Sequence, residues 1–218
     1  MNDKTFRIWN YFFGWAVFAI ALFTFGSTVE PTASFWDAGE YISTSAKLQV
    51  GHPPGAPLFQ MIGAFFALFA PSAQKVALMV NFMSVFSSAF SILFLFWTLT
   101  LLLKKLPNFN SLENLSDKIG FFGSAAVGAL AFCFSDSFWF NAVETEVYAM
   151  ATLILSVLFW MGLRWEEEMN TPRGDRWLLM IAFVIGLSFG VHFMGLLTIP
   201  ALGMIYYFKN YKKVTIRG

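Results

Sequence analysis

Charged residues are scarce in this sequence, at only 12% of its 218 positions. Soluble domains carry about twice that fraction. Apolar residues make up 57%, and they recur in long runs of about twenty residues, enough to cross a hydrocarbon core of ~30 Å. The shortage of charge therefore excludes an ordinary soluble domain. It predicts an all-α fold, a polytopic transmembrane helical bundle.

Cysteine is nearly absent too. The one cysteine, Cys133, lies inside an apolar run, so it has no partner for an internal disulfide, and we interpret it as a packing residue. The net charge is only +1, and no basic, aromatic-rich patch indicates a nucleic-acid partner. The N-terminal "MNDKTFR" precedes a long apolar run without a small-residue cleavage site. We expect a retained first helix and no removed signal peptide.

The apolar runs predict about six spans. The run 177–208 is too long for one crossing and has three glycines near its middle, so we expect two short passes that turn within 190–195. The run 57–70 has fourteen residues, too few for a usual crossing, and we expect it to lie along the membrane surface. The remaining four predicted spans are 8–28, 77–103, 119–135 and 147–163.

The placement of basic residues supports this arrangement. Both termini and the connectors 104–118 and 164–176 then fall on one side, which carries twelve Lys and Arg residues. Only Lys47 and Lys75 fall on the other side. The positive-inside rule predicts such a bias for short loops. We therefore expect one transmembrane domain, 1–218, with both termini in the cytoplasm.

The first external loop, 29–76, interrupts the apolar sequence with acidic, histidine-bearing and proline-rich segments. We expect Ser34 to cap a helix over about 35–50, with Asp37 as the acidic half of a capping box. The elbow "GHPPGA" prevents continuation of that helix, and Pro57 is suited to start the next one. The loop is therefore expected to hold two short interfacial helices.

This topology gathers polar residues at the outward face. Six of the thirteen acidic residues and both histidines lie there, and none lies deep within a predicted span. Ion pathways and proton relays need ionisable groups near the bilayer midplane. The distribution therefore favours chemistry on a lipid-linked molecule at the membrane surface over transport. The two later external connectors contribute Asp136, Glu144, Glu146, Tyr148 and His192.

Each of these residues also has a structural explanation. Asp37 can stabilise the first turn of its helix, and Glu40 can pair with Lys47. Glu144 and Glu146 can be solvated ends of a helix that enters the membrane. His52 can be an ordinary residue of the elbow, and His192 can hydrogen-bond a backbone carbonyl in its bend. A non-catalytic membrane subunit that binds lipid or a partner thus stays an alternative, as does a transporter.

Three blocks of the sequence, "WDAGEYI…GHPPGAPLF", "VETEVYA" and "GLSFGVHFMGLLTIPAL", resemble the GT-C superfamily of membrane glycosyltransferases. Within that superfamily the blocks are most similar to the protein O-mannosyltransferases. More narrowly, they resemble a bacterial O-mannosyltransferase-like family of formerly unknown function. The resemblance covers essentially the whole chain. It departs in the acidic pair, because Asp37 and Glu40 are separated by two residues where the mannosyltransferases have neighbours. Superfamily members also have more spans, which suggests an N-terminal portion or a truncated chain.

The resemblance implies transfer of a mannose-like sugar from a polyprenyl-phosphate donor to a hydroxyl of a protein or glycan, with inversion. It implies a bacterial inner membrane with the active face outside. Asp37 is the implied catalytic base, with Glu40 beside it. No ligand spacing demands a metal, although Asp37, Glu40 and a glutamate of the second loop offer oxygen ligands for Mg²⁺ or Mn²⁺. Residues expected to bind substrate or lipid phosphate are Lys47, His52, Glu144, Glu146, Tyr148 and His192.

Overall fold

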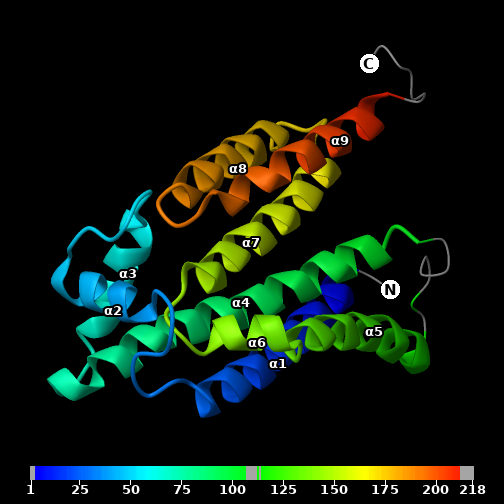
Figure 1. Ribbon diagram of the computed structural model, residues 1–218. Coiled ribbons are helices and arrows are strands. Elements are labelled where there is room, and N and C mark those ends of the chain that lie inside the picture. Colours follow the sequence, from blue (N-terminus) through cyan, green and yellow to red (C-terminus); the bar gives the residue numbers. More distant parts are fainter. Residues whose placement is uncertain (1–2, 107–111, 113, 212–218) are drawn as a thin grey trace.

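The computed structural model describes residues 3–106, 112 and 114–211. Every regular element in those residues is a helix, which confirms the all-α class (Figure 1). Four described helices are long and apolar enough to cross a membrane. They are α1 (Asp3–Ser27), α4 (Val76–Leu103), α5 (Leu115–Cys133) and α7 (Val147–Glu168).

The predicted final pair of spans forms a shorter helical hairpin. α8 (Gly174–Ser188) and α9 (Thr198–Asn210) are separated by a turn and the short 3₁₀ helix η3 (Phe193–Leu197), which places the turn where the glycines predicted it. The two helices have 15 and 13 residues, fewer than the ~20 of a usual crossing. The six predicted spans are therefore four full-length helices and one short pair.

The helices give the bundle two chemically different ends (Figure 1). The start of α1, the α4–α5 and α7–α8 connections and the end of α9 lie at one end, which we call the basic end. It carries nine of the eleven described Lys and Arg residues, whereas Lys47 and Lys75 lie at the opposite end. At the basic end, Glu166 of α7 pairs with Lys105 and, at 3.9 Å, with Lys209 of α9.

α4 lies between the other long helices and contacts α1, α5 and α7. Its apolar residues pack with those of α1 and α5 in one core, which includes the fully buried Phe25, Phe96 and Phe122. A second core lies at the end opposite the basic residues, where Phe59 and Val80 pack with Tyr41, Val147 and Val191. This second core supports the pocket described below.

The first connector holds two helices, as expected, but with different bounds. α2 runs over Ala38–Lys47 and α3 over Pro57–Ala67. Trp36 has a left-handed φ of 62°, a conformation that is incompatible with a right-handed helix. α2 therefore starts after Trp36, later than predicted, and Ser34 does not cap it. Asp37 is the N-cap residue but its side chain makes no capping bond. The capping box was therefore a wrong prediction.

The ends of the two short helices have clear local causes. Leu48, with a left-handed φ of 49°, ends α2 before Gly51 is reached. Pro57 starts α3 as predicted, because a proline at the first helical position gives up no hydrogen bond. α3 has only 11 residues, and it contacts α2 and α4.

Candidate functional site

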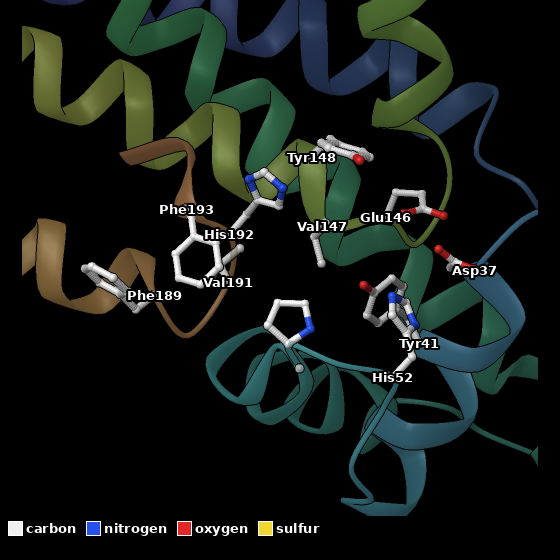
Figure 2. Close-up of a pocket in the computed structure, with 12 residues that line it drawn as sticks. Asp37, Tyr41, His52, Glu146, Val147, Tyr148, Phe189, Val191, His192 and Phe193 are labelled. Atoms are coloured by element: carbon white, nitrogen blue, oxygen red, sulfur yellow. The ribbon is translucent and has the colours of Figure 1, made fainter. Parts of the chain in front are cut away.

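A pocket of about 330 Å³ lies at the end of the bundle opposite the basic end. All three outward connectors contribute to its wall, and Figure 2 shows their side chains facing the same space. Five of the eight site residues proposed from the sequence line it. They are Asp37, His52, Glu146, Tyr148 and His192.

The other three proposed residues lie outside the pocket wall. Lys47 is exposed in the last turn of α2 and is not among the lining residues. Glu144 is buried, with 2% of its surface exposed. Glu40 lies one turn after Asp37 and is bound to the elbow of the first connector. The structure therefore brings five of the eight predicted residues to the pocket wall and places three outside it.

Glu40 fixes the elbow through His52. The backbone N–H of His52 donates to Oε1 of Glu40 at 2.6 Å, and its Nδ1 lies 3.1 Å from Oε2. The backbone bond, followed by the side-chain bond, lowers the pKa of Glu40. The bond to Glu40 in turn raises the pKa of His52. Glu40 thus pairs with His52, and not with Lys47.

Glu146 and Asp37 place two carboxyl groups in unlike surroundings. Asp37 is exposed at the start of α2, whereas Glu146 is only 7% exposed. Burial, followed by the charges of Asp37 and Glu144, raises the pKa of Glu146 to about 7. The backbone N–H groups of Asp37 and Val147 partly oppose that shift. Two carboxyl groups in unlike surroundings are suited to distinct proton roles.

Glu144 lies behind this wall. Its Oε1 has no hydrogen-bond partner within the part of the chain that the structure describes. Burial raises the pKa of its carboxyl, the Ser34 hydroxyl lowers it, and the charge of Glu30 raises it further. Burial is the largest of these effects, so the charged form of Glu144 is less favourable than that of an exposed glutamate.

Two residues of the pocket wall, Asp37 and His52, form a possible metal-ligand set with Glu40. Among the described residues, ligand atoms of Asp37, Glu40 and His52 all lie within 4.8 Å of one another. The two carboxylates and one imidazole could hold a divalent cation such as Mn²⁺. Glu40 and His52 already bond to each other, so a cation would compete with that pair. Neither glutamate of the second connector, Glu144 or Glu146, belongs to this set, although the sequence had suggested one of them as a third oxygen ligand.

Aromatic rings form much of the remaining wall, and the sequence reasoning missed Tyr41. It lies one turn after Asp37 on the same face of α2, a spacing that could have identified it. Burial raises the pKa of its phenol to about 12, and its ring lies 5.8 Å from that of His52. Across the pocket, the Tyr148 and His192 rings lie 5.4 Å apart.

The chemistry of the pocket follows from these groups. It offers an exposed carboxylate, a buried carboxyl, two imidazoles and several aromatic faces, while the described lining residues include no lysine or arginine. Carboxylates accept hydrogen bonds from hydroxyl groups, and aromatic rings provide apolar contact area with a polar edge. This combination suits a ligand that carries hydroxyl groups.

Comparison with known proteins adds a family. Residues 37–215 match the family model described as Protein O-mannosyl-transferase TMEM260 N-terminal domain. The chain is 26% identical over 154 residues to Protein O-mannosyl-transferase tmem260 of Dictyostelium discoideum, covering 70% of this chain and 17% of that relative. It is 30% identical over 176 residues to Protein O-mannosyl-transferase TMEM260 of Mus musculus, covering 79% and 22%. The chain thus spans a small part of these relatives, and no solved structure matched it.

Proposed function

Because the chain belongs to the TMEM260 N-terminal domain family, we propose that its pocket transfers a sugar, mannose by analogy with the named relatives, to a hydroxyl group of a protein. The convergence of Asp37, Glu146 and both histidines on one pocket supports this proposal most directly. The relatives are named protein O-mannosyl-transferases. The GT-C architecture suggested by the sequence is part of the same proposal.

In the proposed reaction the donor is a polyprenyl-phosphate sugar and Asp37 is the base. The acceptor oxygen forms a bond to the anomeric carbon while the bond from that carbon to the phosphate oxygen breaks. The hydroxyl proton passes to Asp37, and the lipid phosphate leaves with the bonding electrons. A phosphate is a good leaving group, so the carboxylate base is the main catalytic requirement. A single displacement inverts the anomeric carbon.

The remaining polar groups have proposed roles around the donor phosphate. His52 is suited to bind it, because its bond with Glu40 favours the protonated ring. Burial raises the pKa of Glu146 to about 7, which suits its protonated carboxyl to donate a hydrogen bond near neutral pH. His192 lies on the opposite wall. Positioned donors of this kind stabilise charge that develops on a leaving group.

The proposed orientation puts the pocket on the non-cytoplasmic face. The excess of Lys and Arg at the basic end supports cytoplasmic termini. The named relatives come from a mouse and a slime mould, so the bacterial inner membrane suggested by the sequence is one of several membranes that suit this topology. A membrane-impermeant thiol reagent should label Lys47→Cys, in a Cys133→Ala background, from outside. Labelling only after permeabilisation would reverse the orientation.

Substitution of Asp37 tests the function. We expect Asp37→Asn in the full chain to reduce transfer of labelled mannose from polyprenyl-phosphate mannose to an acceptor protein by about 100-fold or more. Asp136→Asn is the matched control, because Asp136 is an exposed acid on α6 (Asp136–Ala142) outside the pocket. Full activity of Asp37→Asn would refute the assignment. Absence of donor binding to the unaltered chain would instead favour a non-catalytic subunit.

A further inference from the structure

Asn81, near the start of α4, is a fully buried amide with an exposed fraction of 0%. Its Nδ2 donates to the carbonyl oxygens of Glu30 at 2.7 Å and Thr32 at 3.0 Å. Its Oδ1 accepts a hydrogen bond from the hydroxyl of Thr145, which is also fully buried. Both amide hydrogens and the carbonyl oxygen of one side chain are therefore used, and all three bonds reach other segments.

Those segments are the ones that carry the two pocket carboxyls. Thr32 precedes Asp37 in the first connector, and Thr145 is the neighbour of Glu146 in the second. A further bond joins the connectors directly, since the backbone N–H of Glu30 donates to the carbonyl of Val143 at 2.9 Å. Asn81 thus holds both connectors against the same turn of α4.

An asparagine is well matched to this task. Two carbonyl acceptors and one hydroxyl donor face the side chain, and an amide supplies two donors and an acceptor at one position. An ionised aspartate supplies no donor, and an apolar residue would leave buried polar groups without partners. Ser84 and Ser88 on the same helix are also buried, yet their hydroxyls have no partner in the described chain. Of these three buried polar residues on α4, Asn81 is the one whose side chain bonds to the connectors.

We propose that Asn81 is a positioning residue that sets the separation of Asp37 and Glu146 by holding the two connectors together. The expected effect on sugar transfer rests on the proposed function, whereas the expected effect on the distance between the two connectors does not. A misplacement of a catalytic group by about 1 Å can reduce the rate about 100-fold. Loss of the bonds that hold the two connectors together should therefore slow transfer. Because the charge of Asp37 acts on Glu146, the pH dependence of transfer should move as well.

The experiment measures the connectors directly. Spin labels at Lys47→Cys and Ser137→Cys, both exposed, report the distance between α2 and α6 in the full chain, in a Cys133→Ala background and in lipid nanodiscs. Asn81→Ala removes all three bonds. Thr145→Val removes only the bond to the second connector at nearly constant volume, and Thr145→Ser restores the hydroxyl. Ser84→Ala is the matched control on α4.

We expect a broadened or shifted distance distribution in Asn81→Ala and Thr145→Val, and a native distribution in Thr145→Ser and Ser84→Ala. Transfer per folded molecule should fall about 10- to 100-fold in the first pair, with a shifted pH profile, and recover in Thr145→Ser. If Asn81→Ala does not fold, the comparison of Thr145→Val with Thr145→Ser tests the proposal by itself.

Three results separate the possibilities. A native distance distribution in Thr145→Val would overturn the proposal, whatever the activity. Altered distances with native transfer and an unmoved pH profile would also overturn it, because the connection would then serve stability alone. Altered distances in a chain whose unsubstituted form transfers no sugar would support the role of Asn81 and count against the proposed function.

Discussion

The carbonyl oxygen of Gly190 lies 2.8 Å from the backbone nitrogen of Leu58, so the third connector caps the first turn of α3. The same oxygen accepts from Phe59 at 3.2 Å. The first N–H groups of a helix have no partner within it, and here the turn after α8 supplies one. A Cβ on Gly190 would lie 2.7 Å from the Cβ of Leu58, so only glycine permits this approach.

Gly190→Ala should therefore separate α3 from the third connector. The added methyl group meets a backbone-fixed atom, and we expect a loss of about 1–3 kcal/mol, measured as a lower melting temperature in detergent. Gly186→Ala is the control, since a Cβ there meets nothing within 4 Å and alanine is the better helix former. Equal melting temperatures for the two variants would contradict the contact.

Glu146 should make stability depend on pH. Its pKa is raised from 4.5 to about 7 by burial first, so the folded protein binds a proton there that the unfolded chain has released. Stability should therefore fall as pH rises from about 4.5 to about 7 and then level off, by on the order of 1–3 kcal/mol. Glu146→Gln should reduce this slope in a thermal-shift series and leave the part that Glu144 contributes, whereas Asp136→Asn should keep all of it. An unchanged slope in Glu146→Gln would show that the slope belongs to another group.

Asp37→Asn should change the same titration. The charge of Asp37 is the second cause of the raised pKa of Glu146, so its removal lowers that pKa without restoring the ordinary value, because burial remains. The descending part of the stability curve should then end at a lower pH. An unmoved curve would show that the two carboxyls do not interact.

The Glu40–His52 pair should protect the elbow within a limited pH window. The lowered pKa of Glu40 means that its contribution is lost as pH falls through that value. The raised pKa of His52 means that the charged contribution is lost as pH rises through it. Hydrogen-exchange protection of the His52 amide should be greatest in between. Glu40→Ala should abolish it, and Glu40→Gln, which retains an acceptor, should keep part of it.

We expect transfer to proceed without an added divalent cation. The ligand set of Asp37, Glu40 and His52 is present, but its last two members bond to each other. Activity should therefore be equal with and without a chelator such as EDTA. A loss that Mn²⁺ restores, together with Mn²⁺ binding that Glu40→Gln weakens, would show that the cation replaces the pair.

The sequence predicted those features that depend on local pattern. Apolar run length marked the four long helices, and Pro57 marked the start of α3. The left-handed backbone of Trp36 carries no such mark, because a bulky residue rarely adopts it, and the predicted start of α2 failed for that reason. Glu40 was matched with Lys47 by helical spacing, yet the folded elbow brings His52 to it. Asn81 lies inside an apolar run, and its role could not be predicted because its partners are far away in sequence.

The absence of lysine and arginine among the described pocket-lining residues has a consequence for any anionic headgroup that enters. Two carboxyls repel such a headgroup, so its arrival should draw protons from solution onto Glu146 and His52. By thermodynamic reciprocity, local acidity then strengthens its binding. The pocket would load best in an acidic compartment and unload as the surroundings turn alkaline.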